Sequence, residues 1–428
     1  MINMKKLNKV LMTAGVALFG SYSTLAIAQQ SAAIVCPGYE PAKTQLLGER
    51  SGKKLQRAYE VYLNEELDER ERVKEAISML RDIDSKEDFD TATVNRFLGQ
   101  LLVSEDGKQL EALSLLTRAA DLGVLNDKDQ ADILKLVADL SIQEEKYENS
   151  IKYYKKWMSF TCKEDPDIYT RMAKAYTEMK DFDNVLLTAD LAIANYVQPN
   201  KNPFALKINA FHEKKQYDGA VEVAEILVSL FPGEKNWWSQ LGFFYMLVED
   251  YTKALSTFSL AHKQGYLTKR SEFKALAQLY ASSDVPYKSA QLQKKYMASG
   301  MLESEASDIA SLANTLQLAR EYSEAAKYYG QAAAKSADPD HYRKQGVLLL
   351  TAEDYRGAIT ALTKSIESGI DEEGKVHFSL MEANFYMGNF RKAYEHATEA
   401  QKDPSLRRNA LAWIPYIKQK AENRGVKI

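Results

Sequence analysis

Apolar residues recur along this chain with the spacing of amphipathic helices, and the clearest run lies near its centre. Trp238, Leu241, Gly242 and Tyr245 share one face of a helix. A second helix is expected to open at Tyr251, after a short turn. Because a glycine inside a helix costs about 1 kcal/mol relative to alanine, Gly242 is expected to let a neighbouring helix approach closely. The run therefore predicts a helix, a turn and a second helix.

The opening of this second helix recurs along the chain. The copies at Val73 and Gln109 are degenerate, and the copy at Tyr287 is weak. Before Tyr287 the first-helix residues lie one position further out, which predicts a longer turn at residues 282–286. Such a regular series of intervals indicates a repeat architecture. The ten opening residues, termed anchors, follow one another at intervals of 33 to 38 residues: Val73, Gln109, Tyr147, Phe182, Tyr217, Tyr251, Tyr287, Tyr322, Tyr355 and Phe390.

Helix boundary signals agree with this period. Proline lacks the N–H that the first helical turn leaves unpaired, and glycine adopts the left-handed cap conformation without strain. Glycines stand where second helices should end, at Gly123, Gly265, Gly300 and Gly369. A capping side chain precedes a proline at several expected helix starts: Asp165-Pro166, Asn202-Pro203, Asp338-Pro339 and Asp403-Pro404. The fold is therefore predicted to be all-α.

The central run also matches the W-x2-L-G-x2-Y…A signature, so the sequence resembles the tetratricopeptide-repeat (TPR) family over residues 53–402. The resemblance implies an α-solenoid of about ten helix-turn-helix repeats in a right-handed superhelix. It also implies a protein that binds proteins or peptides rather than an enzyme. Residues 403–428 are expected to form a capping helix and tail, with Pro415 kinking or interrupting that helix.

The start of the chain has the composition of a secretory signal peptide. Cleavage is predicted after Ala28, which leaves residues 29–52 as a leader before a first helix near Lys53. No later stretch approaches eighteen consecutive apolar residues, so a soluble periplasmic protein is expected. The signal within residues 1–28 consists of a basic segment (Lys5, Lys6, Lys9), an apolar segment (residues 10–20) and the cleavage site Ala26-Ile27-Ala28.

The chain contains two cysteines, Cys36 and Cys162. In an oxidising compartment an even count permits one disulfide. The leader after Cys36 could span about 55 Å when extended, so reach does not exclude the bond. Both a disulfide and two free thiols stay open at this point. A lipid-modified Cys36 is disfavoured because Val35 precedes it, where that processing signal requires a small residue.

Charge and motif content argue against several classes of function. The chain carries 56 Lys+Arg and 59 Asp+Glu and no long basic run, so nucleic acid is not an expected partner. The five histidines and two cysteines lack the spacing of metal ligands. No phosphate-binding loop and no nucleophile or metalloprotease motif is present. The sequence predicts a non-catalytic protein without metal or cofactor.

The resemblance assigns the partner-binding positions to the concave face, which in this family is lined by residues 12, 8, 5 and 4 positions before each anchor. Polar residues such as Asn314 and Gln317 occupy this register in other repeats. Apolar patches with amide-rich surface between them would suit an extended or helical peptide. The alternative is that the aromatic residues pack against the next repeat. Two repeats supply the predicted binding residues: Phe243, Met246 and Leu247 in one, and Phe378, Phe385 and Tyr386 in the other.

A narrower resemblance concerns the partner. A signal peptide, an early Cys36-Pro37-Gly38 and repeats that run to the C-terminus look like exported repeat proteins of marine and related gammaproteobacteria. Some of these are encoded beside TonB, ExbB and ExbD, which implies an accessory role in TonB-dependent energy transduction and uptake. The alternatives are an adaptor in outer-membrane assembly or polysaccharide export, and a carrier of a glycan strand or small ligand.

Overall fold

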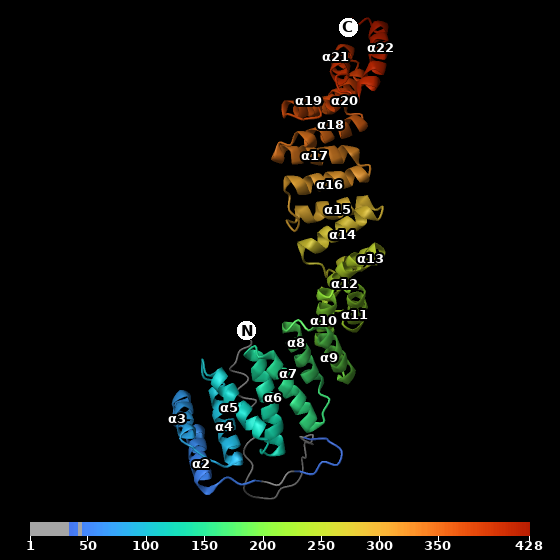
Figure 1. The fold of residues 1–428 in the computed structure, drawn as a ribbon. Helices are drawn as coiled ribbons and strands as arrows, with labels where there is room; N and C mark the ends of the chain where they lie inside the picture. The colour runs from blue at the N-terminus through green and yellow to red at the C-terminus, as the bar shows by residue number, and fades with distance from the viewer. Residues whose placement is uncertain (1–33, 42–44) are drawn as a thin grey trace. The chain divides into compact units, whose positions relative to one another are not determined.

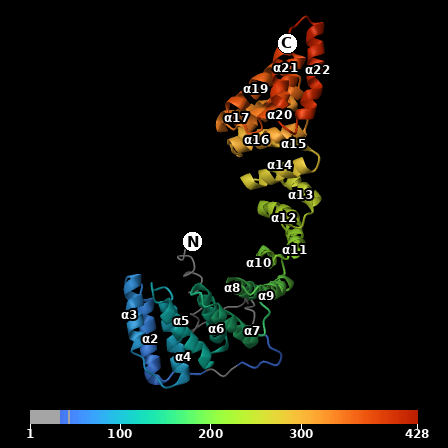
Figure 2. The same ribbon diagram turned by 45° about the horizontal axis from the view of Figure 1, so that its top comes forward.

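The computed structural model describes residues 34–41 and 45–428, so the predicted signal peptide lies outside the described residues. Every regular element in the described part of the chain is a helix. Figures 1 and 2 show consecutive helices lying side by side within each of two compact units. The first unit ends at Met179 and the second spans Lys180–Ile428.

The helices follow one another without other regular structure between them. The first unit contains α2 (Glu49–Leu63), α3 (Glu69–Arg81), α4 (Asp88–Leu102), α5 (Gln109–Leu122), α6 (Asp127–Gln143), α7 (Tyr147–Thr161) and α8 (Pro166–Glu178). The second unit contains α9 (Phe182–Asn195), α10 (Lys201–Glu213), α11 (Tyr217–Leu230), α12 (Lys235–Leu247), α13 (Tyr251–Lys263), α14 (Arg270–Ser282), α15 (Pro286–Ala298), α16 (Ala306–Leu318), α17 (Tyr322–Ser336), α18 (Pro339–Thr351), α19 (Tyr355–Glu367), α20 (Glu373–Tyr386), α21 (Phe390–Ala400) and α22 (Arg407–Asn423).

Each repeat is a pair of these helices, in which an even-numbered first helix is followed by an odd-numbered second helix. Within the units the two members pack on each other, as α4 does on α5 and α18 on α19. Each second helix then packs on the next first helix, as α17 does on α18. The predicted all-α fold is confirmed: the described residues form an α-solenoid of TPR-type repeats.

The second helix of each repeat contains a small residue with no accessible surface. Where both helices of the repeat belong to one unit, it lies on the side of the second helix that packs within the repeat, and a larger side chain would push the two helices apart. The ten positions, each with 0% exposure, are Ala76, Ala112, Ser150, Val185, Ala220, Ala254, Ser289, Ala325, Ala358 and Ala393. They recur with the period of the anchors, so the repeat seen in the sequence is a repeat of close helix contacts.

The seventh repeat corrects one sequence prediction. The helix α15 begins at Pro286 rather than Tyr287, and its fully buried small residue is Ser289, whose hydroxyl donates to the carbonyl of Ala277. The turn between α14 and α15 therefore has three residues, as the turn between α12 and α13 does. The longer turn predicted here is wrong, because a proline at the start of the helix occupies the anchor position and leaves Tyr287 exposed.

The three-residue turn inside a repeat requires a residue in the left-handed conformation. After α12 this residue is Glu249, with φ 61°. The next N–H, that of Asp250, donates to the carbonyl of Tyr245, and the Asp250 side chain accepts from the N–H of Lys253. One aspartate thus ends the first helix and caps the second. The same left-handed position recurs two residues before the second helix at Glu145, Lys180, Lys215, Glu249, Asp284, Arg320, Glu353 and Gly388.

Gly242 confirms the expected close approach. A Cβ atom at Gly242 would lie 2.6 Å from Cε2 of Phe258 on α13. Gly99 meets Leu116 and Gly346 meets Leu362 in the same way. Some repeats instead carry a larger buried residue on the first helix and a fully buried alanine on the second, as in the pairs Ile208 with Ala224 and Met381 with Ala397. A glycine on the first helix thus makes room for a large side chain on the second.

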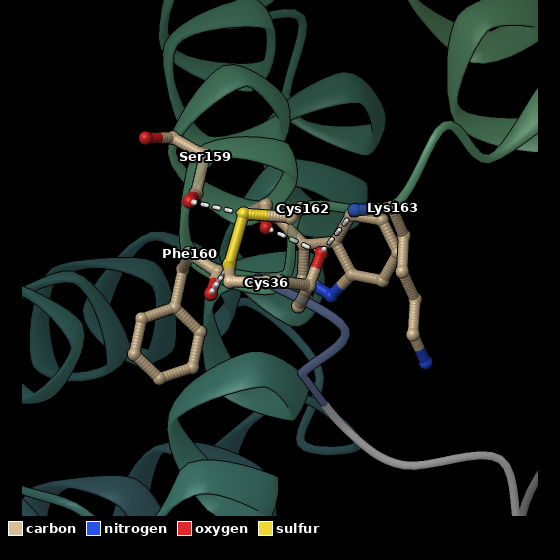
Figure 3. Close-up of a disulfide and its surroundings, with 7 residues drawn as sticks. Cys36, Ser159, Phe160, Cys162 and Lys163 are labelled. Atoms are coloured by element: carbon tan, nitrogen blue, oxygen red, sulfur yellow. Dashed lines mark hydrogen bonds between the residues drawn. A yellow bond between two sulfur atoms is a disulfide. The ribbon is translucent and has the colours of Figure 1, made fainter. Parts of the chain in front are cut away.

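A disulfide joins the leader to the end of α7. The sulfur atoms of Cys36 and Cys162 are bonded (Figure 3), which settles the alternative that the sequence left open. Cys162 follows the last residue of α7 in the left-handed conformation, with φ 54°. Beside the bond, the N–H of Val35 donates to the carbonyl of Thr161 at 2.9 Å.

The leader also contacts the preceding repeat of the first unit, formed by α4 and α5. The Gln45 side chain donates to the carbonyl of Val124, between α5 and α6. The N–H of Gly48 donates to the buried carboxylate of Asp90 at the start of α4. The described part of the leader thus contacts two consecutive repeats, and α2 begins at Glu49, four residues earlier than the sequence indicated.

The last helix closes the other end of the array. In α22, Ala410 and Ile417 are completely buried, and Trp413 is packed in the cluster that includes Ala393 and Ala397 of α21. The helix continues through Pro415, so of the predicted kink or interruption the interruption is wrong. Proline removes one backbone hydrogen bond, and burial of the apolar face of α22 offsets that loss.

Gly242→Ala is expected to destabilise the second unit by about 1–3 kcal/mol, because the new methyl group must displace the ring of Phe258. The measurement is thermal unfolding of the full chain by circular dichroism. Gly233→Ala is the control, since a Cβ there would meet no atom within 4 Å. Equal losses of melting temperature in the two variants would contradict the close-packing interpretation.

Replacing both cysteines, Cys36→Ser with Cys162→Ser, is expected to lower the stability of the first unit by about 2–4 kcal/mol, because the unfolded chain loses its cross-link. Thermal unfolding measures the loss. A thiol assay on denatured, unreduced wild type should find no free thiol. Two free thiols per chain would show that the bond does not form.

Candidate interaction surface

The six predicted binding residues all lie on first helices. Phe243, Met246 and Leu247 belong to α12, and Phe378, Phe385 and Tyr386 belong to α20. We term the positions 12, 8, 5 and 4 residues before the anchors, from α10 to α20, the first-helix face. The first helices α18 and α20 are neighbours along this face. The two groups of predicted binding residues therefore both lie on the first-helix face, in different repeats of the second unit.

Within the α12 group only Leu247 is well exposed. Phe243 packs edge-to-face on Phe258, with ring centroids 5.0 Å apart, and Met246 is half-buried against the same core cluster. Leu247 has 47% exposure and lines a shallow hollow together with Tyr217. Phe243 and Met246 thus contribute mainly to packing, while Leu247 presents apolar surface.

Within the α20 group the exposed residue is Tyr386. Its ring is 56% exposed and stacks on Tyr355, with centroids 5.3 Å apart. Phe385 is partly covered by Trp413 and Tyr416 of α22, at 5.3 and 5.2 Å. Phe378 is half-buried in the cluster that joins α20 to α22. The alternative that aromatic residues pack on the following element therefore describes Phe385 better than Tyr386.

A third exposed apolar residue of this face is not among the six predicted binding residues. Leu318 on α16 lies four residues before its anchor, as Leu247 and Tyr386 do, and it is 65% exposed. Asn314 and Gln317 on the same helix are exposed as well. The first-helix face thus alternates exposed apolar side chains with amides, and its register alone could have identified Leu318.

Glu382 lies between the aromatic residues of α20, eight positions before the anchor Phe390, and is not among the predicted binding residues. Its side chain is half-buried, and burial raises the pKa of its carboxyl above the usual value. Among the described residues none forms a hydrogen bond or ion pair with it. A carboxylate in this position is a candidate recognition group rather than part of a structural ion pair.

The structure also joins two histidines that are 19 residues apart in the sequence. Nδ1 of His377 on α20 and Nδ1 of His396 on α21 are 3.0 Å apart, while the ring centroids are 5.2 Å apart. The two nitrogens therefore lie between the rings and face each other, as in an N–H···N hydrogen bond. Within the described part of the chain, no three side chains are grouped as metal ligands.

None of the described helices is long and apolar enough to cross a membrane.

Comparison with known proteins gives fold likeness alone. No family model matches the chain, and no curated protein matches it. Among solved structures, a tetratricopeptide repeat protein from Parabacteroides merdae is 12% identical, with 59% of this chain and 98% of that chain covered at a TM-score of 0.35. The TPR2AB domain of yeast Sti1 in its pHSP90 complex is 13% identical, covering 60% and 98% at 0.33.

A third solved structure covers more of the chain. Naa15/Naa10 bound to HypK-THB is 13% identical, with 87% of this chain and 65% of that chain covered at a TM-score of 0.44. At such identities and scores these likenesses carry no argument about function. The repeat assignment rests on the helix pairs themselves.

The histidine pair is expected to make the last repeat sensitive to acid. Burial lowers the pKa of both His377 and His396, and each charged ring would also repel the other. The carboxylates of Glu399 and Glu373 raise the pKa of His377 and so oppose the effect of burial, whereas Lys402 lowers this pKa further. Because the folded-state pKa values lie below the unfolded value of about 6.5, this stability is present above pH 6.5 and is lost as the pH falls through the folded-state values.

Melting temperatures at pH 7.5 and pH 5.5 test this expectation. Wild type should lose more on acidification than the double variant His377→Asn/His396→Asn, in which the pair cannot be charged. His212→Asn, which changes an exposed histidine on α10, should behave as wild type does. The expectation fails when the double variant and wild type lose equal amounts.

Proposed function

We propose that this protein is an exported, non-catalytic adaptor that binds a segment of a partner protein on its first-helix face. The observation that carries the proposal is the exposure of Leu247 and Tyr386, 47% and 56%, at equivalent positions of two repeats. Exposed apolar side chains that recur at one position of a shared surface are candidate anchors for a partner.

The surface between the anchors suits a peptide rather than a small molecule. Asn209, Asn314 and Gln317 offer exposed amides that can pair with the backbone of an extended or helical segment. Several repeats share this composition, so the surface is long and open. A partner that supplies apolar side chains at intervals would fit it better than a compact ligand.

Export to the periplasm is the second part of the proposal. Lys5, Lys6 and Lys9, the apolar residues 10–20 and the Ala26-Ile27-Ala28 site support a signal peptide cleaved after Ala28. The Cys36–Cys162 bond is compatible with an oxidising compartment, where disulfides persist.

For the partner system we favour TonB, ExbB and ExbD, with the protein as an accessory in TonB-dependent energy transduction and uptake. This choice rests on the resemblance to exported repeat proteins described above. Outer-membrane assembly and polysaccharide export are the competing adaptor roles. A glycan or small-ligand carrier is the competing role without a protein partner.

Site-specific photocrosslinking in native envelopes tests the adaptor proposal. A photoreactive amino acid placed at position 247 or 386 is expected to give discrete protein adducts, because both positions are exposed on the first-helix face. Position 260 is the matched control, since Leu260 is exposed to a similar degree, 43%, on the second helix α13. Mass spectrometry of the adducts identifies the partner.

The possible outcomes separate the roles. Adducts with TonB, ExbB or ExbD support the favoured system, and adducts with assembly or export proteins support the competing adaptors. Retention on peptidoglycan without a protein adduct indicates a glycan carrier. Adducts from position 260 alone would refute the assignment of the surface.

A further inference from the structure

The first-helix face of the last repeat contains a negative charge that the described chain leaves unneutralised. Glu382 follows Phe378 by four residues and precedes Phe385 by three and Tyr386 by four, so helical spacing places all four side chains on one face of α20. The neighbouring first helix, α18, brings the partly buried apolar residues Val347 and Leu350 to its own side of this repeat. The half-buried carboxylate therefore shares its face of α20 with three aromatic side chains.

Some carboxylates of the second unit pair with a cation, as Asp190 does with Lys207 and Glu324 with Lys294. Among the described carboxyl groups whose pKa departs clearly from its ordinary value, only that of Glu382 is raised. For Glu382, burial is the cause of the raised pKa, and no described cation lowers it. A half-buried carboxylate without a partner costs free energy unless an external group pairs with it.

The aromatic residues beside Glu382 add a second preference for positive charge. The ring of Tyr386 is more than half exposed, and Phe378 and Phe385 are only partly buried. Aromatic faces attract ammonium and guanidinium groups, most strongly where water is partly excluded. A carboxylate flanked by aromatic rings therefore selects for a cation that carries an apolar stem.

We infer that the last repeat binds a lysine or arginine side chain of the partner segment. The charged end of that side chain lies at Glu382, while its aliphatic stem and the neighbouring apolar residues of the partner segment lie against Phe378 and Tyr386. This inference rests on the proposed function, because it names the chemistry of the segment that the first-helix face takes. The alternative is that the face binds an acidic or uncharged segment, and the test below distinguishes the two.

Selection of random dodecapeptides displayed on phage, with the full chain immobilised, tests the inference. Peptides recovered on wild type should contain lysine or arginine at one aligned position, flanked by apolar residues. Glu382→Gln should abolish this enrichment, and Glu382→Lys should replace it with aspartate or glutamate. Glu395→Gln, which removes an exposed carboxylate from α21, is the matched control and should select as wild type does.

A synthetic copy of a wild-type-selected peptide gives the quantitative readout. Replacing its lysine or arginine with glutamine should weaken binding to wild type about tenfold, the scale of a charge-assisted contact, and should leave binding to Glu382→Gln nearly unchanged. Circular dichroism should show that Glu382→Gln keeps its melting temperature or gains a few degrees, because it removes a buried charge.

Failure of the inference and failure of the proposed function give different results. Peptides that bind the first-helix face without a basic residue, or that keep it on Glu382→Gln, overturn the inference and leave the adaptor proposal in place. Recovery of no peptide above the background of uncoated support overturns both.

Discussion

The structure depends on how closely the two helices of each repeat approach. The ten small residues without accessible surface, from Ala76 to Ala393, set that approach on the second helix. On the first helix, Gly99, Gly242 and Gly346 receive the large side chains of Leu116, Phe258 and Leu362. Because interiors are packed to near-crystal density, neither set can grow without separating the helices.

A chain built in this way must deal with its ends. Each repeat packs mainly on its neighbours, so the first and last repeats would expose an apolar side. In the second unit α22 buries Ala410 and Ile417 against that side. In the first unit the leader is fixed to the α4–α5 and α6–α7 repeats by hydrogen bonds and by the Cys36–Cys162 bond. Chain outside the repeat pairs thus covers the last repeat and cross-links two of the earlier ones.

The same close packing leaves one surface of the repeats out of the helix contacts. The second helices and the buried half of each first helix are occupied by packing, which leaves the first-helix face free to vary. That face carries exposed apolar side chains at Leu247, Leu318 and Tyr386, exposed amides, and one carboxylate, Glu382, among aromatic residues. Its charge and apolar pattern can therefore specify a partner without altering the helix contacts that maintain the fold.

The sequence by itself determined the period, the helix pairs and the role of Gly242, because these depend on local spacing, capping residues and side-chain size. It misplaced the anchor at Tyr287, since the aromatic pattern outweighed the proline that starts α15. It could not separate Leu247 and Tyr386 from Phe243 and Phe385, because their exposure is set by Phe258 and by Trp413 of α22. Only the tertiary structure paired Cys36 with Cys162 and His377 with His396 and left Glu382 alone, because each outcome depends on contacts between distant residues.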